Sequence, residues 1–375
     1  MPKRGENIYK RKDHRWEGRY IKCYDEKGKA KYGYVYAATY TDVKKKLSDA
    51  KCDNNTSDEL RKVITYSSII SNWTAMLRIN TKESTYARYY HLIYSHIVPK
   101  LGSKPINQIT NPVIEEFLNE LIFNGRMDGN GGLSNKTVAD ILVLVKRSLK
   151  YASDCGYQTN CKLGSLTIKN SPPEMRVFTI EEQKTLHNYL TTNIDREKFG
   201  ILLCLYTGIR IGELCALKWE NIDTSKGVLQ VRKTMIRIQN VEKTDGAKTK
   251  LIISEPKSKC SIRDIPIPDC LEMYINIFES APSDYVLSGS FDQVIEPRTM
   301  QNRFHKHLML CGIIDANFHA LRHTFATRCV EIGFEVKSLS EILGHTNVNI
   351  TLNRYVHPSI ELKRVNMQKL NSFMI

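Results

Sequence analysis

The spacing of apolar residues changes twice along this chain, and these changes limit the folds that are open to it. Apolar and aromatic residues form short strand-like runs over the first 50 positions, recur at intervals of three and four up to about residue 165, and show both patterns afterwards. A polar stretch at 50–66 and the sequence Pro172-Pro173 mark the two transitions. We therefore expect three domains in the 375 residues, at 1–60, 67–168 and 174–375.

The first 50 residues are strongly basic, with 14 Lys and Arg against 7 Asp and Glu. Runs rich in Tyr, Ile and Val at 7–10, 15–24 and 31–37 predict a three-stranded sheet, and a basic helix follows from Thr41. Such a sheet either exposes solvated lysines or lies against DNA, and the interleaved basic and aromatic residues favour DNA. These residues are Arg15, Trp16, Arg19, Tyr20, Lys22, Tyr32, Tyr34 and Tyr36, of which Arg15, Arg19 and Lys22 are the candidate DNA contacts.

Residues 67–168 have a helical pattern. Apolar residues recur at three and four from Trp73 to Ile97, again after Asn111-Pro112, and from Val138 to Leu149 behind Ser134. These stripes predict a compact bundle of about four helices whose apolar faces form the core. Basic residues off the stripes can reach phosphates, and the candidates are Lys136, Lys146 and Arg147.

Composition excludes several classes of protein. The net charge of +15 and a pI near 9.2 indicate a polyanionic partner, with nucleic acid first. No apolar run is long enough to span a bilayer, and the basic N-terminus lacks the apolar segment of a secretory signal. The ten cysteines contain no Cys-x-x-Cys pair, which predicts reduced thiols in a cytoplasm, without a zinc site.

The C-terminal region contains an ordered set of basic residues. Arg210 follows a glycine turn, and His319 and Arg322 are spaced to share one helix face. His345 lies at a turn, and Tyr355 follows ten residues later. This order resembles the tyrosine site-specific recombinases, the lambda-integrase family, over about 200 residues from 175 to the C-terminus.

The chemistry of phosphodiester cleavage calls for these residue types independently. Negative charge gathers on the non-bridging oxygens during attack, and the planar forks of Arg210 and Arg322 can clamp it. A tyrosine with an ordinary pKa of about 10 needs such neighbours to act as a nucleophile, which is the role expected of Tyr355. We expect His319 to take the tyrosine proton and His345 to hydrogen-bond the phosphate.

Neighbouring polar residues receive more modest roles. We interpret His323 and His357 as structural, and Glu213 as a group that orients Arg210 or caps the fold.

A 3′-phosphotyrosyl product would store the bond energy, so we expect no ATP, metal or other cofactor.

The resemblance also implies a catalytic lysine in a hairpin before a strand that ends in proline, here Ile265-Pro266. Lys257 and Lys259 both satisfy this, and Lys248 and Lys250 are close enough to confuse the register. The context Pro-Lys-Ser-Lys favours Lys257, with Lys259 left open. The expected role is to protonate the departing 5′ oxygen.

The same resemblance implies a mainly α multidomain fold with small β-sheets. Its parts would be an arm-type DNA-binding domain with three strands and a helix, a helical core-binding domain, and a mixed α+β catalytic domain. The implied partners are double-stranded DNA at core and arm-type sites, further copies in a homo-tetramer, and optionally an excisionase-type helper, but no membrane. Docking of the apolar tail at 359–375 in cis or in trans stays open.

We therefore expect an integrase that inserts and excises a mobile genetic element, either a phage or a conjugative transposon, in the bacterial cytoplasm close to the nucleoid. One alternative is a DNA-bridging protein without catalysis, which would lack Tyr355 or one of the arginines. Another is a type IB topoisomerase, which shares the chemistry but relaxes a single duplex. The basic N-terminal module indicates a second DNA site and favours integration.

Overall fold

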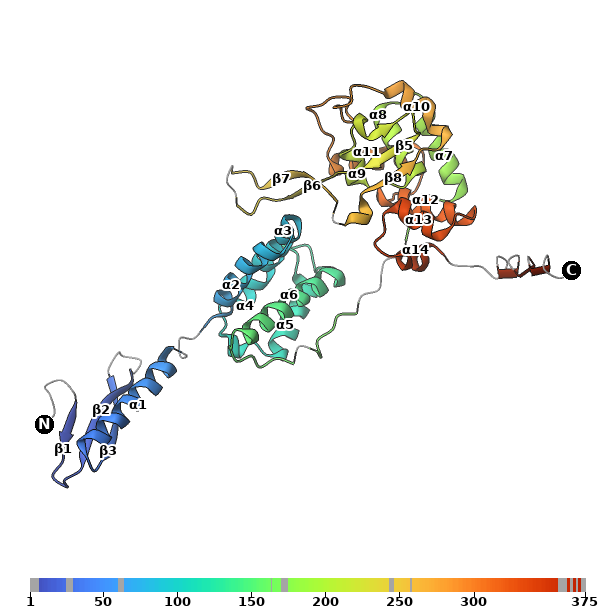
Figure 1. Ribbon diagram of the computed structural model, residues 1–375. Helices are drawn as coiled ribbons and strands as arrows, with labels where there is room; N and C mark the ends of the chain where they lie inside the picture. Colours follow the sequence, from blue (N-terminus) through green and yellow to red (C-terminus); the bar gives the residue numbers. More distant parts are fainter. Residues whose placement is uncertain are drawn as a thin grey trace. The chain divides into compact units, whose positions relative to one another are not determined.

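The computed structural model describes residues 7–24, 30–59, 64–162, 164–169, 175–242, 246–256, 258–356, 363–364, 367–368 and 370–371. The chain separates into two compact units, residues 1–170 and 171–375 (Figure 1). The first unit has two hydrophobic clusters, one around Val43 and a larger one around Ile93 and Val145. The division into three domains stays a prediction, because the first unit contains the first two of them.

The front module, residues 7–59, is a three-stranded antiparallel sheet with one helix. Its elements are β1 (Ile8–Lys10), β2 (Trp16–Tyr24), β3 (Ala30–Ala37) and α1 (Tyr40–Glu59), with strand order β1-β2-β3. Val43 and Leu47 of α1 pack with Ile8 to form a small core on one face of the sheet. The three predicted strands are confirmed.

The predicted linker at 50–66 is wrong over 50–59, because α1 continues to Glu59. No glycine or proline occurs between Tyr40 and Glu59. Extending a helix already anchored by Val43 and Leu47 adds one hydrogen bond per residue at little further cost, so polar residues continue it.

The second part of the first unit is the predicted helical bundle. Its elements are α2 (Tyr66–Asn80), α3 (Glu83–Leu92), a π-helical turn η1 (Ile93–Ile97), α4 (Val98–Leu101), a 3₁₀ turn η2 (Ile106–Gln108), α5 (Asn111–Asn124) and α6 (Asn135–Asp154). The side chain of Ser134 accepts a hydrogen bond from the backbone of Thr137 and so caps the N-terminus of α6.

The C-terminal unit is mixed α and β. Its helices are α7 (Ile180–Thr191), α8 (Arg196–Thr207), α9 (Ile211–Cys215), η3 (Trp219–Asn221), η4 (Lys259–Ser261), η5 (Asp269–Leu271), α10 (Glu272–Phe278), α11 (Pro297–Leu310), α12 (His319–Glu331), α13 (Val336–Leu343) and α14 (Val348–Tyr355). Its strands are β4 (Ile222–Asp223), β5 (Val228–Val231), β6 (Thr234–Gln239), β7 (Thr249–Ser254) and β8 (Arg263–Pro266). The mainly α fold class with small sheets is confirmed.

The strands of this unit form two sheets. The order in one is β4-β5-β8, and β6 pairs with β7 in the other. The strand-like run from 228 to 238 is therefore divided at Arg232-Lys233, because its two halves pair with different partners. A large core of buried side chains, including Phe199, Leu203 and Phe304, lies within this unit.

The remaining expectations concern membrane-spanning helices and the C-terminal tail. Within the part of the chain that the structure describes, no helix has the length and apolar character needed to cross a membrane. The tail at 359–375 lies largely outside the described residues, so the choice between docking in cis and in trans stays open.

Gly208 ends α8 in a left-handed conformation, with φ of +65°. A Cβ atom at this position would lie 2.5 Å from Cδ1 of Phe325 and 3.1 Å from Cδ2 of Leu343. The residue therefore needs both the backbone freedom and the small size of glycine. Its position matters because helices α12 and α13 approach α8 here.

We expect Gly208→Ala to destabilise the protein more than Gly227→Ala. Gly227 has a similar φ of +62°, but a Cβ there would meet nothing within 4 Å. Backbone strain should lower the free energy of unfolding of the control variant by about 1 kcal/mol. Overpacking should lower that of Gly208→Ala by about 1–3 kcal/mol more. Calorimetric unfolding of the full chain measures both, and equal shifts in Tm would contradict the close approach at Gly208.

Candidate active site

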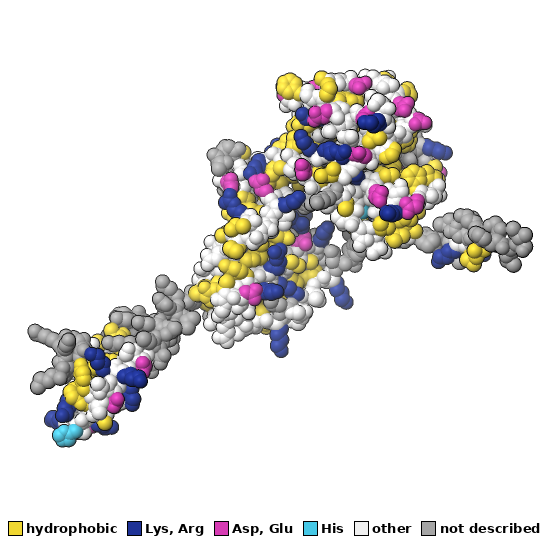
Figure 2. Space-filling model, in the orientation of Figure 1, with side chains coloured by type: hydrophobic (Ala, Val, Ile, Leu, Met, Phe, Trp, Pro, Cys, Tyr) yellow, Lys and Arg dark blue, Asp and Glu magenta, His cyan; other side chains and the backbone are white. Residues whose placement is uncertain are grey.

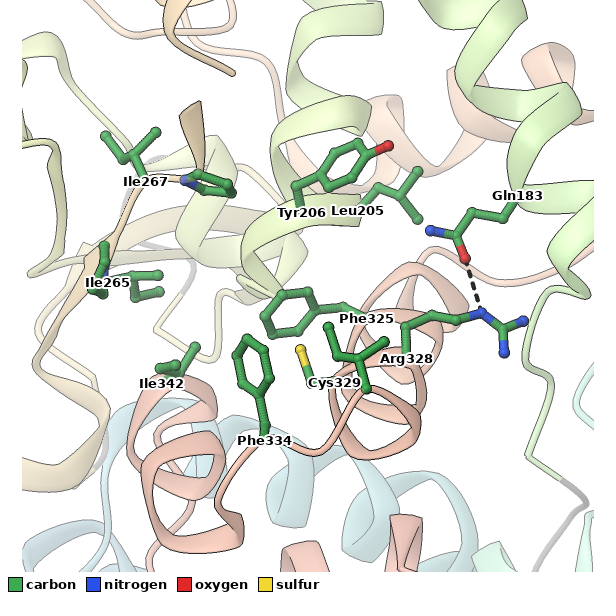
Figure 3. A pocket seen from close by; sticks show the side chains of 13 residues that line it. Gln183, Leu205, Tyr206, Ile265, Ile267, Phe325, Arg328, Cys329, Phe334 and Ile342 are labelled. Atoms are coloured by element: carbon green, nitrogen blue, oxygen red, sulfur yellow. Dashed lines mark hydrogen bonds between the residues drawn. The ribbon is translucent and has the colours of Figure 1, made fainter. Parts of the chain in front are cut away.

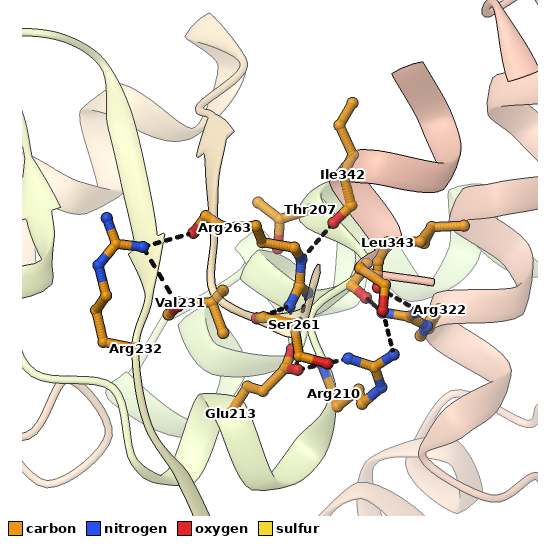
Figure 4. Close-up of polar contacts among 12 residues, drawn as sticks. Thr207, Arg210, Glu213, Val231, Arg232, Ser261, Arg263, Arg322, Ile342 and Leu343 are labelled. Atoms are coloured by element: carbon orange, nitrogen blue, oxygen red, sulfur yellow. Dashed lines mark hydrogen bonds and ion pairs between the residues drawn. The ribbon is translucent and has the colours of Figure 1, made fainter. Parts of the chain in front are cut away.

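Two arginines far apart in the sequence converge on two helix ends (Figure 4). Arg322, on α12, donates from Nη1 to the carbonyl of Gly208 at 2.8 Å and from Nη2 to that of Leu343 at 2.6 Å. Arg210, the residue preceding α9, donates from Nη2 to the carbonyl of Gly344 at 3.2 Å. Both helix ends finish in a left-handed glycine, Gly208 for α8 and Gly344 for α13, which turns the chain and exposes carbonyls to the guanidinium groups.

A buried carboxylate joins Arg210 to a third arginine. Glu213 accepts from Nη1 of Arg210 at 2.6 Å, and from Nη1 and Nη2 of Arg263 at 3.1 and 2.8 Å. It also accepts from the backbone N–H of Arg210 and so begins α9. Burial by itself would raise the pKa of Glu213, but Arg263 and Arg210 outweigh it and hold that pKa below its ordinary value. The expected orienting role of Glu213 agrees with these contacts.

Arg263 connects this cluster to the chain segment before β8. Its Nε donates to the carbonyl of Ile342 at 2.5 Å, and its Nη1 donates to that of Ser261 at 3.1 Å. Its side chain is buried. Arg263 was not among the sequence candidates, although its place at the start of the strand ending in Pro266 is a signal that could have been used.

The predicted lysines lie next to this segment. Lys257 is outside the described residues, so the structure does not test the preference for it. Lys259 begins η4, and its side chain is likewise outside the described part. Ser258 and Ser261 are joined by a hydrogen bond between their hydroxyls at 2.8 Å. The lysine-bearing turn is therefore tied to the arginine cluster through Ser261 and Arg263.

Tyr355, the last residue of α14, is 5% exposed. Its ring packs in an apolar cluster with Ala326 and Leu343, and it lies parallel to the ring of His345 at 6.3 Å between centroids. The hydroxyl is not in an apolar setting, because it is 2.8 Å from Nδ1 of His323. Nδ1 of His345 is bonded to the hydroxyl of Thr351 at 2.8 Å.

The three histidines are held neutral by their surroundings. Burial, with His323 and Arg322 next, lowers the pKa of His319 to about 3. Burial and the charge of Arg322 lower the pKa of His345 to about 4. Burial, followed by the charge of Arg354, lowers the pKa of His323 to about 4. Each imidazole therefore has one nitrogen that can accept a hydrogen bond near neutral pH.

The site carries an excess of positive charge. Burial lowers the pKa of Arg322 to about 9, and the charge of Arg210 adds to this effect while Glu213 opposes it. Burial raises the pKa of Tyr355, and the charges of Arg322 and Arg354 oppose that rise. An anion bound between these cations would relieve their repulsion, which suits the site to a phosphate.

The structure thus brings together five of the six predicted catalytic residues. Arg210, Arg322, His319, His345 and Tyr355 meet where α9, α12, α13 and α14 approach one another. The sequence interpretation of His323 as structural overlooked its contact with Tyr355, and the charge of Arg354 beside Tyr355 was also missed. His323 directly follows Arg322, and Arg354 directly precedes Tyr355. This adjacency in the sequence could have identified both residues.

In the front module, the two faces of the sheet differ. Arg19 of β2 pairs with Tyr34 of β3, and its guanidinium lies 3.4 Å from the ring centroid of Tyr32. Tyr32, Tyr34 and Tyr36 are exposed on this open face. Arg15 is exposed and paired with Asp13, and the side chain of Lys22 is outside the described part.

The expectation that Trp16 and Tyr20 face DNA is wrong. Both pack against the Val43–Leu47 side of α1, because alternate residues of a strand point to opposite faces and α1 covers theirs. Figure 2 shows Lys and Arg side chains, in dark blue, on the surface of the front module and of the bundle.

The candidates in the bundle have different surroundings. Lys136, at the start of α6, is exposed. The ammonium of Lys146 donates to the carbonyl of Leu166 at 2.6 Å, so it holds the segment after α6. The guanidinium of Arg147 is exposed and lies over the rings of Trp73 and Tyr89. Lys136 and Arg147 therefore keep their side chains available, whereas Lys146 is engaged within the bundle.

A separate apolar cavity of about 450 Å³ lies beside α12 in the C-terminal unit (Figure 3). None of the predicted catalytic residues that the structure describes lines it. Its walls come from Gln183, Leu205, Tyr206, Ile265, Pro266, Ile267, Pro268, Phe325, Arg328, Cys329, Ile332, Phe334 and Ile342. Across the described residues, no group of three or more His, Cys, Asp or Glu is arranged to hold a metal ion.

Comparison with known proteins agrees with this geometry. Residues 176–361 match the Phage integrase family, and residues 65–122 match the Phage integrase, N-terminal SAM-like domain. A tyrosine recombinase XerC-like protein of Caldanaerobacter subterraneus is 29% identical over 340 residues, which cover 83% of this chain and 84% of that protein. The transposase from transposon Tn916 of Enterococcus faecalis is 22% identical over 413 residues, covering 98% and 96%.

Solved structures show the same fold at low identity. The Tn1549 transposon integrase in complex with a circular intermediate DNA has a TM-score of 0.65 at 21% identity, covering 82% of this chain and 100% of that one. A lambda integrase tetramer bound to a Holliday junction has a TM-score of 0.58 at 17% identity, covering 95% and 97%. With the two matched segments spanning more than half of its length, the chain belongs to the phage integrase family of tyrosine recombinases.

Proposed function

We propose that this protein is a site-specific DNA recombinase that cleaves and rejoins strands through a covalent link between Tyr355 and a 3′ phosphate. The observation that carries the proposal is the convergence of Arg210, Arg322 and a hydrogen-bonded tyrosine hydroxyl from three distant parts of the chain. A purely structural tyrosine would not require the charges of Arg322, Arg354 and Arg210 to act on its hydroxyl.

The residues divide the work of phosphoryl transfer. Arg210, whose side chain is 33% exposed, meets the phosphate first. The carbonyls of Gly208 and Leu343 occupy two of the five N–H donors of Arg322, so the guanidinium is oriented and still has donors for phosphate oxygens. His319 and His345, neutral with low pKa values, can each donate one N–H to a phosphate oxygen.

Cleavage needs neither a metal nor ATP in this proposal. The arginines supply the positive charge that a metal would otherwise supply, and the phosphotyrosyl link keeps the energy of the broken bond. Lys257 protonates the departing 5′ oxygen. Rejoining is the reverse step, with a 5′ hydroxyl from another strand as the attacking group.

We further propose that the biological reaction is integration and excision of a mobile element by a tetramer on two DNA segments. The Tn1549 and lambda integrases were solved on DNA, the latter as a tetramer. A topoisomerase would need one DNA site only, whereas the open face of the front module offers a second basic, aromatic surface. The bundle would contact core DNA through Lys136 and Arg147, and the front module would contact arm-type DNA.

Tyr355→Phe should abolish the covalent protein–DNA adduct while leaving DNA binding nearly unchanged. The substitution removes only the hydroxyl and keeps the ring that packs on Leu343. A nicked suicide substrate followed by a denaturing gel measures the adduct. Tyr189→Phe is the control, because that hydroxyl also bonds a histidine, His307, at 3.1 Å. Adducts that survive in Tyr355→Phe would place the nucleophile elsewhere.

Lys257→Ala should slow cleavage of ordinary DNA by about 100-fold or more, the typical contribution of an acid catalyst. The loss should be much smaller with a 5′-phosphorothiolate leaving group, which departs without a proton. Lys259→Ala is the matched control from the same turn. An equal loss on both substrates would reject Lys257 as the acid, and a relieved loss in Lys259→Ala instead would transfer the role to Lys259.

Arg19→Ala should weaken binding to full attachment sites and leave cleavage of core sites unchanged. Loss of one phosphate contact lowers the slope of log affinity against log salt by about one. Lys45→Ala removes the same charge from the exposed part of α1, on the other side of the sheet, and serves as the control. Filter binding across a salt series measures both. Identical slopes would show that the open face does not read DNA.

A further inference from the structure

His323 has a contact with the nucleophile that no other histidine in the described part of the site has. Its Nδ1 lies 2.8 Å from the hydroxyl oxygen of Tyr355, with the ring centroids 5.7 Å apart. His319 lies edge-on against the His323 ring at 4.5 Å, and Nδ1 of His345 is bonded to Thr351. His323 therefore lies next to the phenol of Tyr355 and also next to His319, the proton acceptor expected from the sequence.

The charges around His323 explain how a proton is kept and then released. The groups that face it are the ring of His319, the cations Arg322 and Arg354, and Tyr355 itself, and no carboxylate of the described residues is among them. Burial and these cations lower the pKa of His323 to about 4, and burial raises the pKa of Tyr355. Without DNA the proton stays on the phenol, and in the tautomer with the ring proton on Nε2 the Nδ1 atom accepts its hydrogen bond.

A bound phosphate changes this balance. Its negative charge beside Arg322 offsets the repulsion that this cation exerts on a protonated His323 imidazole. His323 then becomes more basic at the step in which the phenol must lose its proton. The phenol itself becomes more acidic as its oxygen bonds to phosphorus, so the proton leaves during the attack on the bound phosphate.

We propose that His323, not His319, accepts the proton of Tyr355 during strand cleavage, and this inference rests on the proposed recombinase function. The bond from the Tyr355 oxygen to phosphorus forms while the bond from phosphorus to the 5′ oxygen breaks, and its electron pair leaves with that oxygen. The phenolic proton moves to Nδ1 of His323, and the lysine protonates the 5′ oxygen. During rejoining, His323 returns its proton to the tyrosine oxygen.

The chain supplies internal controls, because tyrosine–histidine pairs of similar geometry occur away from the arginines. The hydroxyl of Tyr189 is 3.1 Å from Nδ1 of His307, and that of Tyr206 is 3.0 Å from Nδ1 of His187. Their ring centroids are 5.7 and 5.8 Å apart. Such a pair alone stabilises the fold, so the arginines beside His323 are what distinguish it.

The experiment compares His323→Gln, His323→Ala and His307→Gln in the full-length protein on a nicked suicide substrate under single-turnover conditions. Glutamine can accept the hydrogen bond of the phenol but cannot take its proton. We expect both His323 variants to lose about 100-fold or more in the rate of adduct formation, with DNA binding retained, and His307→Gln to resemble the parent. Added imidazole should restore His323→Ala, where the ring leaves a space, but not His323→Gln.

A second substrate distinguishes a defect in the base, which accepts the tyrosine proton, from a defect in the acid, which protonates the 5′ oxygen. The 5′-phosphorothiolate should relieve the defect of the lysine variant and leave that of His323→Gln unchanged. Near-parental cleavage by His323→Gln would overturn the inference, since it would show that holding the hydroxyl is enough. Relief of His323→Gln by the phosphorothiolate would also overturn it. If the parent itself forms no Tyr355 adduct, the recombinase proposal fails, which the Tyr355→Phe comparison reveals separately.

Discussion

The active site holds the cations of Arg210 and Arg263 close together, and the buried carboxylate of Glu213 makes this possible. Glu213 accepts hydrogen bonds from Arg210 and Arg263 while almost no part of it is exposed. Removing one partner from a buried ion pair typically costs about 3–5 kcal/mol, because the remaining charge is left desolvated. Arg210 therefore keeps its place between α9 and Gly344 only while Glu213 is ionised. Arg263, which also pairs with Glu213, holds the lysine-bearing turn through the carbonyl of Ser261.

Arg322 is held differently, by carbonyl groups and not by a carboxylate. It is only 2% exposed, and its donors are directed at Gly208 and Leu343. Carbonyls orient the guanidinium without neutralising it, so burial and Arg210 lower its pKa to about 9. The site thus stores electrostatic repulsion that a phosphate relieves. The two left-handed glycines, Gly208 and Gly344, make this arrangement possible because they end helices where the carbonyls are needed.

Much of the fold and of the candidate site followed from local pattern. Strand periodicity placed β1, β2 and β3 within one or two residues, and the spacing of His319 and Arg322 put both on α12. The polar linker at 50–59 was mistaken because composition does not report that α1 is already anchored by Val43 and Leu47. Trp16 and Tyr20 were assigned to the wrong face, since alternation shows which residues share a face but not which face a helix will cover.

The amino-acid sequence alone was sufficient for the residue types, their order and their local elements, because these depend on interactions within a few positions of the chain. Only tertiary structure decided which imidazole meets the phenol of Tyr355. His323 and Tyr355 are 32 positions apart and meet through the packing of α12 against α14. The direction of a side chain across such an interface depends on how two helices are rotated about their axes, and the pattern of either helix by itself leaves that rotation undetermined.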